Sequence, residues 1–163
     1  MRLHRFFVSE KIGNLNKKEI KSEDLYNQLK KVFRFKTGDK IVLFDNSGYE
    51  YVSVISGMDS GIIRFSIEEA IDKSFTLNKK IYLFASVVKK DTFEWIVEKA
   101  TELGVTDIVP VLSTRSEKKN INEERLNKIA IESSEQSGRV YVPNIHNIID
   151  FNNCFDFIKQ NKI

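Results

Sequence analysis

The sequence has few of the residues that mark cross-linked, metal-binding or membrane proteins. It contains 163 residues, with one cysteine, two prolines and seven glycines. The single thiol, Cys154, cannot form an internal disulfide, and no Cys/His spacing predicts a metal site. No apolar run approaches the ~20 residues of a membrane-spanning helix, and the N-terminus lacks a signal-peptide pattern. We therefore expect a cytoplasmic protein without a resident metal or a membrane partner.

Neither sign of charge is in marked excess. Lysine and arginine number 26 and aspartate and glutamate 23, which gives a net charge of +3. That charge is too small to predict a nucleic-acid partner by itself. Hydrophobic residues make up 41% of the chain and charged residues 30%, an ordinary composition for a globular protein. Any site for a polyanion must therefore come from local clusters of basic side chains.

The first half of the chain has the pattern of a small β-barrel. Residues 41–44, 49–55 and 63–67 read as short strands, and Asp45-Asn46-Ser47-Gly48 has hairpin-turn chemistry. Several short strands at this spacing, with one helix, are within range for a small barrel. The polar stretch 68–78 ends the strand pattern. We expect one domain at 1–74 and a second at 75–163.

One helix is predicted inside the first domain. Ser22 can accept hydrogen bonds from the free N–H groups of its first turn. The helix is basic towards its end, which also suits the helix dipole and leaves a purely structural explanation open. Its buried face is expected to consist of four apolar residues: Leu25, Leu29, Val32 and Phe33.

The second half is organised around one helix between two apolar runs. Residues 81–88 and 108–112 are nearly continuous apolar runs, typical of strands covered on both faces. Asp91 or Thr92 is expected to cap the helix, and Gly104 to end it. A strand, a helix and a strand of these lengths predict a right-handed βαβ unit. The solvent-exposed face is expected to carry Glu98, Lys99, Thr101 and Glu102. The expected buried stripe is Phe93, Ile96, Val97, Ala100 and Leu103.

Further elements complete the second domain. Asn122 is expected to cap another helix, which Gly138 ends. A short strand is predicted near Ile145. A last helix is expected to bury Phe155 and Ile158.

Basic and hydroxyl side chains follow both predicted strands of the βαβ unit. Lys89 and Lys90 come after the first strand, and Ser113-Thr114-Arg115-Ser116 follows the second. Because the carboxyl ends of parallel strands share one edge of the sheet, ligands bind there. Cations and hydroxyls together suit an anion such as phosphate, although from the spacing alone ordinary solvated loops are the favoured explanation.

Several segments resemble one family in register over nearly the whole chain. The most specific are Glu98-Lys99-Ala100-Thr101-Glu102-Leu103-Gly104 and Glu135-Gln136-Ser137-Gly138-Arg139. Further matches are Arg5-Phe6-Phe7-Val8, Val32-Phe33-Arg34-Phe35-Lys36-Thr37-Gly38-Asp39 and Phe44-Asp45-Asn46-Ser47-Gly48-Tyr49-Glu50-Tyr51. With these residues the chain resembles the RsmE family, the methyltransferases that modify N3 of a uridine in 16S rRNA.

The resemblance implies an α/β protein with a small β-barrel. It implies a PUA-like RNA-binding barrel followed by the front half of a SPOUT-type α/β-knot methyltransferase domain. Family members bind S-adenosylmethionine in the knot and act as homodimers. The family's Gly-Pro-Glu-Gly-Gly type cofactor loop does not occur here. We therefore expect no cofactor-binding residue in this chain, and we interpret the chain as a C-terminally shortened form.

The resemblance also suggests which residues contact 16S rRNA or the small ribosomal subunit. Arg115 and Arg139 are the candidates near the reaction, and both are expected at the same sheet edge as Lys89 and Lys90. No catalytic base is assigned. His4, His146 and Trp95 are expected to be structural. The expected RNA contacts are Arg2, Arg5, Lys30, Lys31, Arg34, Lys36, Lys89 and Lys90.

Two other functions remain open at this stage. A non-catalytic rRNA-binding module would bind RNA but not the cofactor. A flavodoxin-like protein would use the strand edge for a nucleotide phosphate, but no glycine-rich loop follows Val88.

Overall fold

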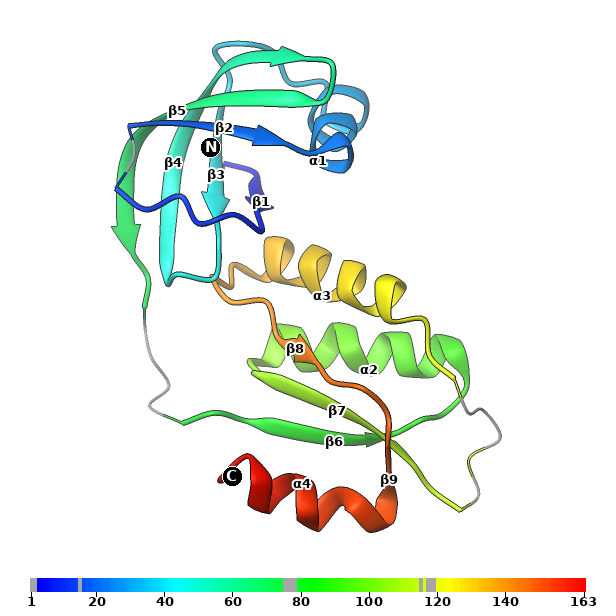
Figure 1. The fold of residues 1–163 in the computed structure, drawn as a ribbon. Helices are drawn as coiled ribbons and strands as arrows, with labels where there is room; N and C mark the ends of the chain where they lie inside the picture. The colour runs from blue at the N-terminus through cyan, green and yellow to red at the C-terminus, as the bar shows by residue number, and fades with distance from the viewer. Residues whose placement is uncertain (1–2, 15, 75–78, 115, 117–119) are drawn as a thin grey trace. The chain divides into compact units, whose positions relative to one another are not determined.

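The computed structural model describes residues 3–14, 16–74, 79–114, 116 and 120–163. The chain divides into two compact units, Met1–Phe75 and Thr76–Ile163 (Figure 1). Each unit has its own sheet and its own buried apolar core.

The first unit is a curved five-stranded sheet with the order β1-β3-β4-β5-β2. Strand β1 pairs with β3 in parallel, and the other pairs are antiparallel. The register of β4 against β5 shifts at two places, and such bulges increase twist and bend a sheet. The bend lets the sheet close around an apolar core. The strands are β1 (Arg5–Phe7), β2 (Lys17–Lys21), β3 (Lys40–Phe44), β4 (Tyr49–Asp59) and β5 (Ile62–Asp72).

Strands β5 and β2 differ from the prediction. Strand β5 continues to Asp72, through residues that the sequence pattern assigns to the domain boundary. Its second half is mostly exposed, so its side chains carry no alternation of apolar and polar residues. The sequence also gives no sign of β2, because Ile20 is its only buried residue. Charged side chains are expected on such an edge strand, since they discourage pairing with another chain.

The helix of the first unit begins where the sequence predicts but changes its winding. Ser22 Oγ accepts a hydrogen bond from Leu25 N at 3.2 Å, which confirms the cap. Helix α1 (Glu23–Asn27) then passes into a π-helix, η1 (Gln28–Val32). The wider winding of a π-helix rotates the residues that follow it. The prediction of Val32 and Phe33 in the buried face was therefore wrong: their exposed fractions are 70% and 36%.

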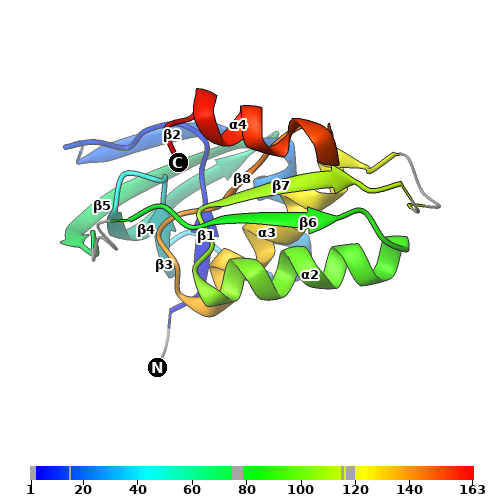
Figure 2. The ribbon, with the colours of Figure 1, turned by 90° about the horizontal axis from the view of Figure 1, so that it is seen from below.

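The second unit is a parallel sheet covered on both faces (Figure 2). Strand β7 pairs with β6, β8 and β9, always in parallel. Helices α2 and α3 cover one face, and α4 lies on the other, after the 3₁₀ turn η2 (Phe151–Asn153). The strands are β6 (Tyr82–Ser86), β7 (Asp107–Leu112), β8 (Asn144–Ile145) and β9 (Ile149–Asp150), and the helices are α2 (Lys90–Leu103), α3 (Glu123–Ser137) and α4 (Cys154–Gln160).

Helix α2 begins earlier than predicted. Lys89 is its N-cap and makes no side-chain capping bond, so the predicted cap at Asp91 or Thr92 was wrong. Gly104 ends the helix with φ +104°, as predicted.

The buried face of α2 is also rotated from the predicted one. Leu103 is 84% exposed and Thr101 is fully buried, the reverse of the expectation. Thr101 Oγ1 donates to Val97 O at 2.7 Å, which satisfies the hydroxyl inside the core. Trp95 is 59% exposed, so it is not the packing residue that the sequence suggested.

Helix α3 confirms both predicted ends. Asn122 Oδ1 accepts from Arg125 N at 3.0 Å, and Gly138 adopts φ +85°. Helix α4 differs from the prediction, because Phe155 is 70% exposed. The aromatic residue that packs on the sheet is Phe157, whose ring lies edge-on to Phe84, with the ring centroids 5.8 Å apart.

We predict that Gly104→Ala destabilises the second unit more than Gly38→Ala destabilises the first. Both glycines have φ near +100°, a conformation that costs an alanine about 1–2 kcal/mol. A Cβ at Gly38 would meet nothing within 4 Å, whereas one at Gly104 would lie 2.7 Å from Arg139 Nη1. Calorimetric unfolding measures both losses. Equal losses would mean that Arg139 moves aside without cost.

Candidate functional site

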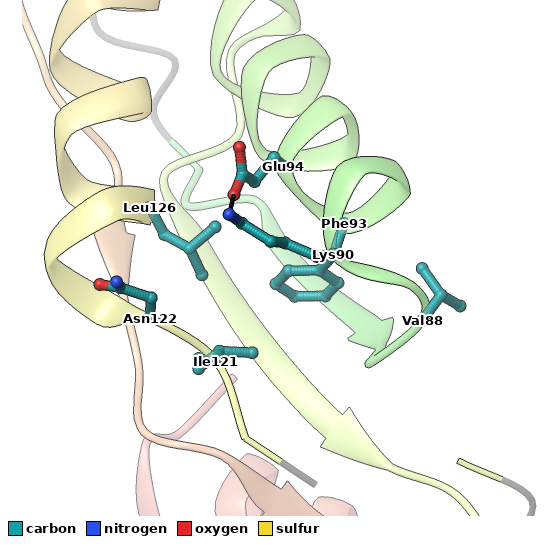
Figure 3. Close-up of a pocket in the computed structure, with 7 residues that line it drawn as sticks. All are labelled: Val88, Lys90, Phe93, Glu94, Ile121, Asn122 and Leu126. Atoms are coloured by element: carbon teal, nitrogen blue, oxygen red, sulfur yellow. Dashed lines mark ion pairs between the residues drawn. The ribbon is translucent and has the colours of Figure 1, made fainter. Parts of the chain in front are cut away.

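A pocket of about 230 Å³ lies beyond the carboxyl end of β6, between the first turns of α2 and α3 (Figure 3). Helices α2 and α3 both follow the carboxyl end of a parallel strand, which places their N-termini at the same edge of the sheet. The helix N-termini bring partial positive charge to the pocket. Its apolar lining is Val88, Phe93, Ile121 and Leu126, and its polar lining is Lys90, Glu94 and Asn122.

Two cations at this pocket share one carboxylate. Glu94 Oε1 lies 3.8 Å from Lys90 Nζ, and Glu94 Oε2 lies 3.3 Å from Arg125 Nε. The Glu94 side chain is 17% exposed, so this pairing is partly shielded from water. Glu94 thereby links the first turns of α2 and α3. An external anion would have to compete with Glu94 for both cations.

The strand edge predicted from the sequence exists in the structure. Ser86 pairs with Val111, and Val87 N donates to Val111 O at 2.9 Å, so β6 and β7 end side by side. Lys89 and Lys90 are exposed immediately beyond β6. Ser113 follows β7, and its Oγ lies 3.1 Å from Ser116 Oγ. Arg115, one of the two residues expected near the reaction, lies outside the described residues.

Arg139 does not lie at this edge, contrary to the expectation. Its guanidinium packs against Gly104, which follows the last turn of α2, whereas Lys90 begins that helix. A helix of 14 residues spans about 21 Å. Burial lowers the pKa of the Arg139 guanidinium from its ordinary value. The structure therefore separates Arg139 from Lys90 by the length of α2.

The basic residues expected to meet RNA in the first unit differ in their surroundings. Lys31, Arg34 and Lys36 are exposed, and none of them forms an ion pair with a residue that the structure describes. Lys30 Nζ is exposed too, but donates to Tyr26 Oη at 2.5 Å. Arg2 lies outside the described residues.

Arg5 is a correction to the expected set of RNA contacts. It is 9% exposed, and its guanidinium pairs with Glu50 at 2.8 Å. The guanidinium also lies 4.9 Å from the centre of the Phe44 ring. An arginine in the interior of the unit stabilises the packing and does not present its charge to RNA.

A buried carboxylate at the opposite edge of the second sheet was missed by sequence reasoning. Asp107, 3% exposed, begins β7. Burial alone would raise its pKa, but hydrogen bonds from His146, Thr106 and Asn144 outweigh that effect and hold the pKa below its ordinary value. His146 Nε2 lies 2.9 Å from Asp107 Oδ1. An acidic residue directly before an apolar run was the signal that could have found it.

In the described part of the chain, no three His, Cys, Asp or Glu side chains gather closely enough to hold a metal ion. The same residues include no helix long and apolar enough to cross a bilayer. The pocket, at about 230 Å³, is smaller than the ~300 Å³ at which small-molecule sites begin, and its one carboxylate is engaged by Lys90 and Arg125. This pocket is therefore too small for S-adenosylmethionine.

Both units match known family models. Residues 75–163 match the RNA methyltransferase domain, and residues 22–68 match the RNA methyltransferase PUA domain. The chain belongs to the RsmE family. Its first unit is a PUA-like domain, and its second is part of the family's α/β methyltransferase domain.

Individual RsmE relatives cover almost the whole chain. The ribosomal RNA small subunit methyltransferase E of Rickettsia conorii is 27% identical over 161 residues, which is 99% of this chain and 64% of that protein. The Bacillus subtilis protein of the same name is 27% identical, over 91% of this chain and 61% of the relative. The chain therefore spans less than two thirds of the length of these curated relatives.

Solved structures share the fold. The methyltransferase E of Neisseria gonorrhoeae bound to S-adenosyl methionine superposes with a TM-score of 0.82 at 26% identity, covering 95% of this chain and 65% of that one. A Legionella pneumophila protein in complex with the same cofactor has a TM-score of 0.84 at 22% identity, over 98% of this chain and 67% of that one. The second likeness supports the fold alone.

We predict that Asp107→Asn lowers the stability of the second unit by about 1–3 kcal/mol at neutral pH, because an amide cannot accept all three hydrogen bonds. The depressed pKa means that the charge stabilises the fold above the unfolded-state pKa of about 3.9. This contribution disappears as the pH falls through the folded-state pKa. The difference between variant and wild type should therefore narrow below about pH 4.

Urea unfolding followed by circular dichroism at several pH values tests this dependence. Asp150→Asn, which replaces an exposed carboxylate, is the control and should change stability little at any pH. A constant difference between Asp107→Asn and wild type from pH 7 to about pH 2.5 would contradict the assignment.

Proposed function

We propose that this chain takes part in S-adenosylmethionine-dependent methylation of N3 of a uridine in 16S rRNA. The observation that carries the proposal is the alignment of both units with the Rickettsia conorii methyltransferase E over 99% of the chain. In this proposal the PUA-like unit holds the RNA, and the second unit supplies the front part of the catalytic domain. The work takes place in the cytoplasm, where ribosomes assemble, with the chain as a homodimer.

The basic side chains have defined tasks in the proposed reaction. Lys31, Arg34 and Lys36 bind the RNA backbone in the first unit, and Lys89 and Lys90 do so in the second. Such contacts position RNA without reading its sequence, and they weaken as salt rises. Lys30 and Lys90 contribute less, because their ammonium groups are engaged by Tyr26 and Glu94.

Methylation at N3 requires that the uridine leave its stack and lose its N3 proton. Extrusion of the base gives the enzyme access to the ring, and a fixed cation stabilises the anion that forms. Arg115, which follows β7 in the sequence, is our first candidate for that cation. Arg139 is the second, because it lies at the far end of α2 from Lys90. No step of methyl transfer is assigned to the pocket between α2 and α3, since that pocket is too small for the cofactor.

A second candidate function is a non-catalytic rRNA-binding module. The small size of the pocket between α2 and α3 favours it. This candidate predicts that the chain binds 16S rRNA but neither S-adenosylmethionine nor a methyl acceptor.

Deletion of the gene, followed by mass spectrometry of 16S rRNA nucleosides, separates the two candidates. If the gene product is the methyltransferase, N3-methyluridine disappears and returns when the gene is restored. Unchanged N3-methyluridine, together with retained binding of the protein to 16S rRNA, would establish the binding module instead. Calorimetric titration of the purified protein with S-adenosylmethionine gives an independent readout.

We predict that the double substitution Lys31→Ala, Lys36→Ala reduces the salt dependence of RNA binding. Each lysine that neutralises a phosphate contributes about 0.7–0.9 to the slope of log K against log salt, so the slope should fall by about 1.5. Lys40→Ala is the matched control, because Lys40 already pairs with Glu68 at 2.7 Å. Affinity titrations across a range of salt concentrations measure both. An unchanged slope in the double variant would remove these lysines from the RNA interface.

A further inference from the structure

Four aromatic rings gather beside the π-helix of the first unit; we call them the aromatic cluster. Phe33 and Phe35 lie nearly parallel, with an interplanar angle of 9° and ring centroids 5.7 Å apart. Phe6, which is fully buried, meets both edge-on, at 5.2 Å from Phe33 and 6.1 Å from Phe35. His4 completes the cluster, at 4.7 Å from Phe33 and 5.7 Å from Phe35. Phe6 anchors the cluster to the core of the unit.

The outer side of the aromatic cluster is open to solvent. His4 is exposed, and Phe33 retains 36% of its surface. Val32, the preceding residue, is 70% exposed. The π-helix η1 is the reason, because its wider winding turns Val32 and Phe33 out of the buried face. The fold thus fixes the position of the Phe33 ring while leaving part of it exposed to solvent.

The charged residues in the segment from Leu25 to Gly38 are all basic. Asp39 follows this segment directly, and its carboxylate accepts a hydrogen bond from the backbone N of Lys36 at 2.7 Å. Lys31, Arg34 and Lys36 alternate with the aromatic residues in this stretch, and none of the three forms an ion pair with a described residue. Aromatic surface interleaved with uncompensated cations complements single-stranded nucleic acid.

The backbone at Arg34 adds a second indication. Arg34 adopts φ +60°, in the left-handed region that glycine occupies most readily and that long side chains rarely adopt. Glycine would satisfy this backbone at least as well as arginine. An arginine here points to a task for the guanidinium that the backbone does not require.

We propose that the exposed surface of His4 and Phe33 stacks one unpaired base of single-stranded RNA, while Lys31, Arg34 and Lys36 contact the phosphates beside it. This inference rests on the proposed function, because it names the form of RNA that the first unit holds. Stacking on an aromatic ring tolerates any base. The aromatic cluster favours unpaired over duplex RNA, since the faces of paired bases are already covered by their neighbours.

The test compares Phe33→Leu with Tyr49→Leu in the full chain. Both substitutions replace an aromatic residue of the first unit with leucine. The two aromatic residues have similar exposed fractions, 36% for Phe33 and 38% for Tyr49. Fluorescence anisotropy measures binding of labelled decauridylate and of a labelled RNA duplex. We expect Phe33→Leu to weaken decauridylate binding about tenfold, with an unchanged salt slope, because stacking is lost and no phosphate contact changes. Tyr49→Leu should stay within about twofold of wild type.

Two further variants separate stacking from folding and from charge. His4→Ala removes the outermost ring without altering the core, and should also weaken decauridylate binding. Arg34→Gly removes the steric cost of the positive φ at this position, so the melting temperature of the variant should be equal to or above that of wild type. Its affinity for decauridylate and the salt slope of that binding should both fall, because a phosphate contact is lost. Calorimetric melting of every variant identifies any loss of folding.

The outcomes distinguish this inference from the proposed function. If wild type binds decauridylate and both Phe33→Leu and His4→Ala bind it equally well, the stacking inference is overturned and the proposed function stands. Equal losses for Phe33→Leu and Tyr49→Leu, or equal affinity for duplex and decauridylate, would also overturn it. If wild type binds neither RNA at low salt, the proposed function itself fails.

Discussion

The parallel pairing of β6 with β7 is the constraint on which the second unit depends. Five consecutive residue pairs, from Tyr82 with Asp107 to Ser86 with Val111, fix the register of the two strands. Because the pairing is parallel, the chain must return over the sheet, and α2 makes that return. The same pairing decides which loops are neighbours. It places Lys89 and Lys90 beside Ser113, and it places Asp107 at the opposite edge.

The two edges of this sheet have different chemistry as a result. At the carboxyl edge, Glu94 holds Lys90 and Arg125 across the first turns of two parallel helices. At the amino edge, Asp107 collects hydrogen bonds from three neighbours, and the Arg139 guanidinium covers the end of α2 at Gly104. The carboxyl edge leaves exposed lysines for a ligand. At the amino edge, the charged groups of Asp107 and Arg139 contact other residues of the same unit.

Much of this arrangement can be predicted from the sequence where one local signal acts alone. The apolar runs of β6 and β7, the caps at Ser22 and Asn122, and the stops at Gly104 and Gly138 depend on neighbouring residues only. Their predictions are confirmed. The carboxyl edge also follows from the sequence, because a βαβ connection brings the ends of its two strands together.

The wrong predictions concern residues whose burial depends on a contact with a distant part of the chain or on a small rotation of a helix face. The buried stripe of α2 ends at Thr101 and Gly104, so a shift of one residue exposes Leu103. The insertion of a π turn in η1 cannot be read from helical spacing, and it reverses the environment of Phe33. Arg5 is buried because Glu50, far along the chain, offers a partner. Residue types alone therefore identified basic candidates without separating interior from surface, and they missed the aromatic cluster, whose members come from two separate segments.

The exposed position of Trp95 gives the protein a built-in optical probe. It is the only tryptophan of the chain, and it lies on the solvent side of α2 in the second unit. Intrinsic tryptophan emission therefore arises from the methyltransferase part alone, from an indole already largely hydrated in the folded state. Unfolding of the PUA-like unit alone would not change the Trp95 emission directly. A partner that covers the outer face of α2 would shift the emission maximum towards the blue. A spectroscopist can thus watch one unit of this molecule without labelling it.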